Sequence, residues 1–245
     1  MFIDLHSHIL PGIDDGADSV MESLSMAKVA SESGTNIIVA TPHFNNPEKT
    51  HGKIDFSVIS DSFASLTDEL KNADISVRLF QGAEILARSN LEEFCESKSV
   101  VTINGSRYVL VEFYFDESID NVHHYTDILI DYGYIPVIAH PERYSFFYGD
   151  DADREDIYSL LEKGCRFQLN TNSILGNNGK PSEDFAMWML ESGCAHIIAS
   201  DCHNVLTRSG DLSDVYIRLL DLFPEKKLQE WLHDNPKRIL LDLDI

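Results

Sequence analysis

Short apolar runs alternate along the chain with amphipathic stretches, and this alternation is the main structural pattern of the sequence. Each run is five to nine residues long and rich in β-branched residues, which is typical of a buried strand. The runs are FIDLH (2–6), NIIVAT (36–41), SVRLFQGAE (76–84), RYVLVEF (107–113), PVIAH (136–140), RFQLN (166–170) and HIIASD (196–201). The pattern therefore predicts seven strands.

The stretches between the runs carry helix signals. In SVMESLSMAKVASESG, Ser19 and Glu22 stand in the spacing of a capping box, and Gly34 closes the segment. A glycine also stands just before later runs, at Gly133, Gly164 and Gly193. Buried strands that alternate with helices indicate an α/β fold with a parallel sheet covered on both faces. Seven such units favour a closed barrel over an open sheet.

Two segments depart from this alternation. Asn104–Gly105 has the composition of a tight hairpin turn. From about Leu212 onward the chain is predicted to be helical, and Asn235-Pro236 resembles a cap followed by proline at the first helical position. Because no linker or low-complexity tract divides the chain, we expect a single domain, with a barrel over about 1–208 and a helical tail over about 212–245.

Composition excludes several classes of protein. The 245 residues include 19 basic and 41 acidic ones, a net charge of −22, so binding to nucleic acid is not expected. No apolar run is long enough to span a membrane, and the N-terminus lacks the basic region of a signal peptide. The four cysteines contain no Cys-x-x-Cys pair, which is typical of reduced thiols. The expected location is the cytoplasm.

Side chains that bind metals stand at the ends of six of the seven runs. They are His6 with His8 just after it, His43, Glu84, Glu112, His140, and Asp201 with His203 just after it. One such residue at a strand end is more often a cap or a solvated side chain. Because the carboxyl ends of parallel strands meet at one edge, six together predict a metal site there. Histidine and carboxylate ligands without thiolate suit zinc, manganese or iron, and magnesium less.

Several motifs together resemble a known family. The stretches HSHILPGIDDG, ATPH, HPER and SDCHN are similar to the PHP (polymerase and histidinol phosphatase) superfamily, and most of all to its bacterial protein-tyrosine phosphatases of capsule and exopolysaccharide systems. The resemblance covers about residues 2–208. It implies a distorted seven-stranded β/α barrel that holds three divalent metal ions, with manganese favoured, iron or zinc as alternatives, and magnesium less suited.

The resemblance also implies roles for single residues. One metal would be held by His6, His8, Glu84 and Asp201, a second by Glu84, Glu112 and His140, and a third by Asp15, His43 and His203, with Glu84 as the bridge. Asp14 is left without a role, since spacing alone does not choose between Asp14 and Asp15. The implied catalytic residues are Arg143 and Arg208, which would bind phosphate, together with Asp201 and His43. Either His43 or a metal-bound water would protonate the leaving group.

Other residues allow more than one interpretation. Arg208 follows Cys202 in the Cys-x5-Arg spacing of thiol phosphatases. We interpret this spacing as coincidence, because the loop lacks the glycines of such phosphatases. Gln168 and Asn170 end the sixth run, and the sequence does not decide whether they line the site or lie outside it. Gly12 and Gly16 are expected to take positive φ and fold their loop over the edge of the sheet.

The resemblance implies a metal-dependent phosphotyrosine-protein phosphatase, in which a metal-activated hydroxide hydrolyses a phosphate monoester. The implied substrate is the tyrosine-rich tail of a cognate bacterial tyrosine kinase of polysaccharide biosynthesis. One alternative is a small-molecule phosphatase of the same superfamily, such as a histidinol phosphatase. Another is a non-catalytic regulator that keeps a metal-stabilised barrel. Neither the native metal nor the oligomeric state follows from the sequence.

Overall fold

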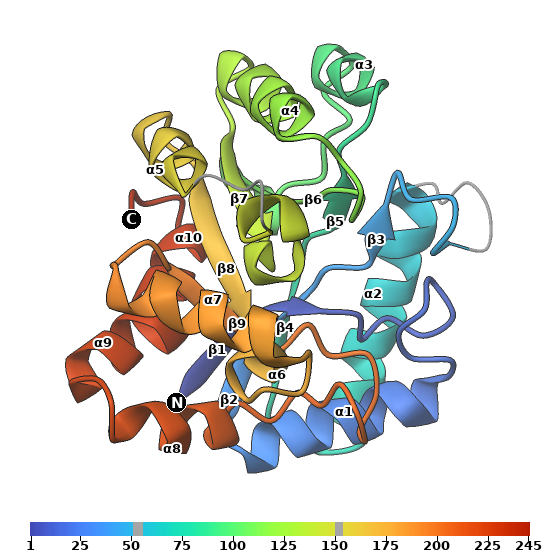
Figure 1. Ribbon diagram of the computed structural model, residues 1–245. Helices are drawn as coiled ribbons and strands as arrows, with labels where there is room; N and C mark the ends of the chain where they lie inside the picture. Colours follow the sequence, from blue (N-terminus) through green and yellow to red (C-terminus); the bar gives the residue numbers. More distant parts are fainter. Residues whose placement is uncertain (51–55, 150–153) are drawn as a thin grey trace.

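The computed structural model describes residues 1–50, 56–149 and 154–245, and it has an α/β fold in which helices surround the strands (Figure 1). The strands are β1 (Phe2–Ser7), β2 (Thr35–Ala40), β3 (His43–Phe44), β4 (Arg78–Gln81), β5 (Glu84–Leu86), β6 (Tyr108–Glu112), β7 (Ile135–Ala139), β8 (Arg166–Asn170) and β9 (Ile197–Ala199). They form one sheet in the order β1-β2-β4 and another in the order β3-β5-β6-β7-β8-β9. Each of these neighbouring pairs is parallel, so the predicted α/β class with parallel strands is confirmed.

The helices begin and end near the signals that the sequence carries. They are α1 (Val20–Glu32), α2 (Phe56–Asn72), α3 (Leu91–Glu96), α4 (Ile119–Asp131), α5 (Glu155–Glu162), α6 (Thr171–Ile174), α7 (Lys180–Glu191), α8 (Ser213–Leu220), α9 (Glu225–Gln229) and α10 (Asn235–Leu240), with shorter turns η1 (Ile103–Gly105), η2 (Pro141–Arg143), η3 (Ser145–Phe147) and η4 (Glu230–Asp234). Ser19 caps α1 by accepting a hydrogen bond from Glu22 N (3.3 Å). Gly34 follows this helix at φ +97°. Over the described ranges, the helices are all too short or too polar to cross a membrane.

The second and third predicted runs are each followed or interrupted by an additional short strand. The second run forms β2, and Pro42, which has no amide hydrogen for strand pairing, separates it from β3. The third is interrupted between β4 and β5 at Gly82. Hydrogen bonds still join the two interrupted segments to each other, from Gly82 N to Ala40 O (2.9 Å) and from Glu84 N to Pro42 O (3.1 Å).

The two sheets also meet where β1 lies beside the end of β9. Ser7 and Cys202 form an isolated parallel bridge, and Asp201 N donates to His6 O (2.9 Å). Buried apolar side chains of β1, β2, β6, β7 and β9 pack into one inner cluster, which α10 also enters. Because the strands are grouped in two sheets, a single closed barrel of seven strands stays a prediction.

The predicted hairpin at Asn104–Gly105 is wrong. These residues lie in the 3-10 turn η1, where Asn104 has φ +51° and Gly105 φ +71°. An Asn-Gly pair accepts positive φ, and here that freedom closes a turn before β6. Both edges of β6 are occupied by the parallel strands β5 and β7, so a hairpin partner has no edge to pair with.

The predicted helix cap at Asn235 is also wrong. Asn235 is itself helical (φ −64°, ψ −48°), and its side chain donates to His196 O (2.9 Å). The π-helical turn η4 lies directly before it and joins α9 to α10. A proline inside a helix removes a hydrogen bond and clashes with the preceding turn. Pro236 is the second residue of α10, in the first turn of that helix, where a proline is tolerated.

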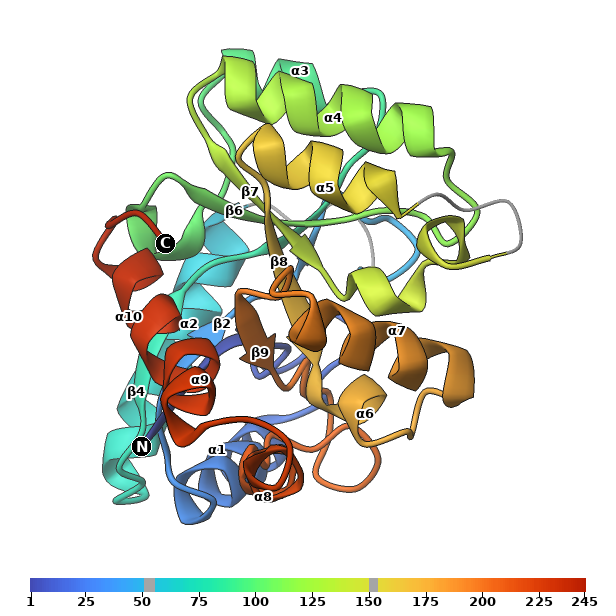
Figure 2. The same ribbon diagram turned by 60° about the vertical axis from the view of Figure 1, so that its left-hand side comes forward.

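The end of the chain lies against the amino-terminal ends of the strands (Figure 2). Tyr108, at the start of β6, donates from its hydroxyl to Leu243 O (2.9 Å). Arg166, at the start of β8, donates to Ile245 O (2.8 Å). Arg107 forms an ion pair with Asp242 (3.1 Å). This C-terminal segment therefore covers the edge of the sheet opposite to the predicted site.

Candidate metal centre

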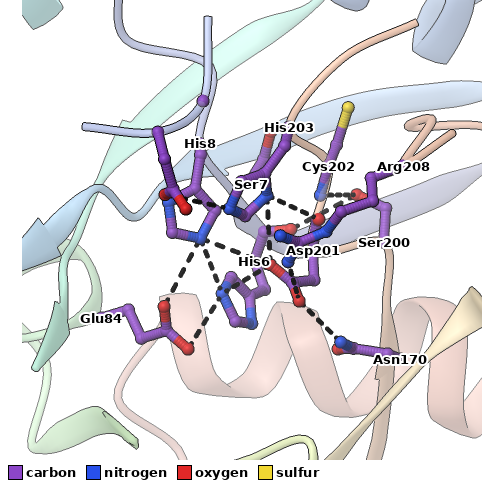
Figure 3. A network of polar contacts seen from close by, with 12 residues as sticks. His6, Ser7, His8, Glu84, Asn170, Ser200, Asp201, Cys202, His203 and Arg208 are labelled. Atoms are coloured by element: carbon purple, nitrogen blue, oxygen red, sulfur yellow. Dashed lines mark hydrogen bonds and ion pairs between the residues drawn. The ribbon is translucent and has the colours of Figure 1, made fainter. Parts of the chain in front are cut away.

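All nine predicted metal ligands come together in one cluster, part of which is shown in Figure 3. They are His6, His8, Asp15, His43, Glu84, Glu112, His140, Asp201 and His203. Most stand at or just after the carboxyl ends of β1, β6, β7 and β9, while His43 and Glu84 open the short strands β3 and β5. Eight of the nine are buried, and Asp15 has 33% of its side chain exposed.

Glu84 lies at the centre of the cluster and contacts four histidines. Its Oε1 is 2.9 Å from His140 Nε2 and 3.4 Å from His6 Nε2. Its Oε2 is 3.0 Å from His43 Nδ1 and 3.4 Å from His8 Nε2. A carboxylate with neighbours on both oxygens has the placement that a bridging ligand needs.

The ligand atoms also fall into smaller groups that share members. His43 Nδ1 is 2.9 Å from Glu112 Oε1, and its Nε2 is 3.2 Å from Asp15 Oδ1. Asp15 Oδ1 is also 3.3 Å from His203 Nε2. The groups with ligand atoms within 4.8 Å of one another are His8, Asp15, His43 and His203; His6, His8 and Asp201; and His43, Glu84 and Glu112. Because His8 and His43 each occur in two groups, the division of the ligands among individual metals stays a prediction.

Hydrogen bonds behind His6 determine which of its ring nitrogens carries a proton. Asn170 Nδ2 donates to Asp201 Oδ2 (2.6 Å), Gln168 Nε2 donates to Asn170 Oδ1 (2.8 Å), and Gln168 Oε1 faces His6 Nδ1 (2.8 Å). Because a carboxylate can only accept, each amide in this relay has one orientation, and His6 Nδ1 must be the donor. The lone pair of neutral His6 is therefore on Nε2, which faces the cluster. Gln168 and Asn170 thus line the site.

Asp14, which spacing left without a role, holds His8 in the same way. His8 Nδ1 donates to Asp14 Oδ2 (2.7 Å), and Asp14 also accepts from His43 N (2.8 Å) and Gly16 N (3.0 Å). Such carboxylate–histidine pairs orient metal ligands. Gly12 has the expected positive φ (+67°), but Gly16 does not. Gly16 is required by close approach instead, since a Cβ there would lie 2.1 Å from His8 O.

Two residues of the loop after β3 contact the predicted ligands, although the sequence gives no signal that singles them out. Asn46 Nδ2 donates to Glu112 Oε1 (2.8 Å), and the Lys49 ammonium forms an ion pair with Asp15. Each fixes a carboxylate that also faces His43.

The donor atoms fit a divalent cation. His6 Nε2 and His8 Nε2, the two nitrogens with inward lone pairs, are 3.2 Å apart, and Asp201 Oδ1 lies 3.3 Å from His8 Nε2. Lone pairs at such distances repel one another unless a proton or a metal lies between them. Within the described part of the chain, Glu84 Oε2, Asp201 Oδ1 and His203 Nε2 are buried without a hydrogen-bond partner. Buried polar atoms of this kind are costly, and imidazole and carboxylate are ordinary metal ligands.

The charges of the cluster shift its pKa values strongly. Burial lowers the pKa of His43, but Glu84 and Glu112 outweigh this effect and hold it well above the usual value. Burial raises the pKa of Glu84, yet His6 and His43 hold it well below the usual value. Burial and the neighbouring His8 lower the pKa of His203 to about 4. Protons on some imidazoles and metal cations therefore compete for the same carboxylates.

The two predicted phosphate-binding arginines meet at Asp201. The Arg208 guanidinium forms an ion pair with Asp201 Oδ2, and Arg143 Nη1 lies 3.5 Å from the same oxygen. Their side chains are 30% and 28% exposed, so both remain open to solvent at the surface of a buried metal cluster. A planar guanidinium can bind two phosphoryl oxygens at once.

Two site residues have a left-handed backbone that residue type does not predict. His140, directly after β7, has φ +35°, and Asp201, two residues after β9, has φ +51°. This conformation costs on the order of 1–3 kcal/mol for a residue other than glycine, and it is typical of functional sites. It turns the chain sharply at the point where each ligand is presented.

Cys202 does not have the surroundings of a nucleophile. Its side chain is buried, its sulfur lies 3.6 Å from Asn204 O, and it points away from the histidines in Figure 3. Burial raises the pKa of the Cys202 thiol, whereas thiol phosphatases need a thiolate. The structure therefore supports the interpretation of the Cys-x5-Arg spacing as coincidence.

Comparisons with known proteins agree with the motifs. Residues 2–241 match the family "Capsular polysaccharide synthesis, CpsB/CapC". Tyrosine-protein phosphatase YwqE of Bacillus subtilis is 36% identical over 214 residues, which are 84% of this chain and 79% of that protein. Tyrosine-protein phosphatase CpsB of Streptococcus pneumoniae is 30% identical over 250 residues, 98% of each chain.

Solved structures show the same relationship. One of the crystal structures of YwqE and CpsB, which are called unique metal-dependent tyrosine phosphatases, matches with a TM-score of 0.88 at 31% identity and covers 99% of this chain and 96% of its own. A lactonase from Listeria monocytogenes matches with a TM-score of 0.61 at 12% identity over 98% of this chain and 94% of its own, which shows a shared fold alone. The chain therefore belongs to the CpsB/CapC family of capsular polysaccharide synthesis.

Proposed function

We propose that this chain is a metal-dependent phosphotyrosine-protein phosphatase. The observation that carries the proposal is the buried cluster of histidines and carboxylates with two arginines directed at one of its members, Asp201. The relatives named tyrosine-protein phosphatases match over most of the chain, and the cluster supplies the ligands that a metal-dependent reaction needs.

We assign three divalent ions to the cluster, manganese first, held by the three ligand sets that the motifs imply. Divalent cations bound there would neutralise phosphoryl oxygens and activate water at neutral pH. The absence of thiolate from the cluster and its mixture of nitrogen and oxygen ligands support manganese, iron or zinc over softer or harder ions.

The chain's own residues bind the phosphoryl group and supply a proton to the leaving group. Arg143 and Arg208 hold phosphoryl oxygens and stabilise the charge of the transition state. A phenolate, whose parent pKa is about 10, needs less help from an acid than an alkoxide does. His43 contacts carboxylates through both ring nitrogens, so it can bind a metal through one and keep a proton on the other.

The substrate that we infer is the phosphorylated tail of a cognate bacterial tyrosine kinase. The matching family is one of capsular polysaccharide synthesis, and a net charge of −22 is unsuited to nucleic acid.

We place the protein in the cytoplasm, as a single catalytic domain over 1–245. The bonds between β1 and the end of β9 and across the interruptions at Pro42 and Gly82 support a distorted seven-stranded barrel.

The test combines metal analysis with phosphate release from a phosphotyrosyl peptide and from histidinol phosphate. We expect bound divalent metal, manganese-stimulated release from the peptide, and a much lower rate on histidinol phosphate. His140→Ala should abolish release, whereas His124→Ala, which changes an exposed histidine of α4, should not. Activity that survives a chelator, or a preference for histidinol phosphate, would contradict the proposal.

A further inference from the structure

An exposed aromatic side chain lies at the edge of the metal centre, and the proposed hydrolysis leaves it without a role. Phe115 follows β6 three residues after Glu112 and is 56% exposed. Isolated exposed apolar residues are common and need no explanation. Phe115 is not isolated, because its ring lies 5.7 Å from the ring of Tyr144 and 5.1 Å from the guanidinium carbon of Arg143.

Phe115, Tyr144 and Phe146 form a row that we name the aromatic rim. The Tyr144 and Phe146 rings stack at 4.9 Å with an angle of 11° between their planes. Tyr144 is buried, and its hydroxyl accepts a hydrogen bond from Phe113 N (3.0 Å), so the middle of the rim is held in place. The Tyr144 ring also lies 5.4 Å from the ring of His140. The aromatic rim thus extends from a predicted metal ligand out to the solvent at Phe115.

Arg143 joins the aromatic rim to the phosphate-binding position. Its Nη1 lies 3.5 Å from Asp201 Oδ2, and its guanidinium carbon lies over the Phe115 ring. A phosphoryl group bound by Arg143 therefore has the Phe115 ring nearby. In phosphotyrosine the group joined to the phosphate is a phenyl ring, and aromatic rings associate in offset or edge-to-face contact at such distances.

We propose that Phe115 is the surface on which the phenyl ring of the substrate packs, so that the aromatic rim selects aryl phosphates over alkyl phosphates. The inference rests on the proposed phosphatase function and adds to it the residue that distinguishes tyrosine from an aliphatic ester. Phe115 is a specificity residue, since the metals and the two arginines still hold the phosphoryl group.

The test measures binding of phenylphosphonate and methylphosphonate to the metal-loaded full chain by titration calorimetry. Both probes resist hydrolysis, and they differ only in the group on phosphorus, a phenyl ring in one and a methyl group in the other. We expect the wild type to prefer phenylphosphonate. Phe115→Ala should reduce this preference about fivefold while methylphosphonate affinity changes less than about twofold, as for the loss of one aromatic contact. Phe115→Tyr should keep the preference, and Phe115→Leu, which is apolar but lacks a ring, should reduce it as Phe115→Ala does.

Tyr132→Ala serves as the matched control. Tyr132 is also an exposed aromatic residue (41%), but it lies before β7, whereas the predicted ligand His140 follows the other end of β7. If Phe115→Ala weakens both probes equally, Phe115 acts by positioning Arg143 and the inference is overturned. An unchanged preference in Phe115→Ala, or none in the wild type, overturns it too. Failure of the proposed function looks different: phenylphosphonate is preferred, but phosphotyrosyl peptide releases no phosphate.

Discussion

Polar groups are satisfied differently at the metal centre and at the opposite end of the molecule, where the C-terminal segment meets the starts of β6 and β8. At this opposite end, Tyr108 and Arg166 donate hydrogen bonds to backbone oxygens of the C-terminal segment. At the metal centre, Glu84 and Asp201 each have a buried oxygen without a hydrogen bond from the described residues. The hydrogen bonds of Tyr108 and Arg166 therefore stabilise the fold, whereas the free oxygens of Glu84 and Asp201 are available to a cation.

The largest expected difference between the two ends is their response to pH. Burial opposes protonation of His8 and His43, but nearby carboxylates hold both pKa values well above the usual value, so metal must displace protons. Below these raised pKa values, apparent manganese affinity should therefore rise by about tenfold per pH unit for each proton that the metal displaces. Above them, the affinity should no longer depend on these histidines.

Calorimetry of manganese binding at pH 7, in two buffers with different ionisation enthalpies, gives the number of protons released. We expect at least one. Binding that releases none would mean that the imidazoles are already neutral, and the comparison between the two ends would lose its electrostatic basis.

A smaller effect is expected from breaking the relay behind His6. Gln168→Leu removes the acceptor of His6 Nδ1, so metal affinity should fall about tenfold to a hundredfold, as for other partners of metal-bound histidines. Unfolding by urea in the presence of chelator should change much less. Gln168→Glu keeps an acceptor for His6 and should retain more affinity than Gln168→Leu. Equal affinity in all three proteins would show that the relay does not orient His6.

The smallest effect is expected at the other end. Tyr108→Phe removes the hydrogen bond to Leu243 O and should lower the free energy of unfolding by about 1 kcal/mol, measured by urea denaturation. Manganese affinity should not change. Tyr158→Phe, at an exposed tyrosine of α5, is the control for loss of a hydroxyl. A change of metal affinity in Tyr108→Phe would show that the two ends are coupled.

The sequence predicted the site better than the path of the chain that builds it. Apolar runs and the metal-binding residues that end them are local features, so α/β folding and the clustering of eight residues followed from them, whereas Asp15 was assigned through the family resemblance. The role of Gln168 was out of reach, because it lies 162 positions from His6 and an amide at a strand end has no distinctive chemistry. The same holds for Tyr108 and Leu243, 135 positions apart, and for the left-handed backbone at His140 and Asp201.

The relay from Asp201 to His6 has a direction, and its direction comes from a single carboxylate. Asparagine at position 201 can donate as well as accept, so both amides behind it would be free to turn over. His6 would then be able to place its proton on Nε2 and lose its inward lone pair. One substitution thus removes the Asp201 carboxylate and also the constraint that keeps the His6 lone pair directed inward, so these two ligands depend on each other. A chain that keeps His6 but lacks Asp201 holds a histidine whose presence says little about metal binding.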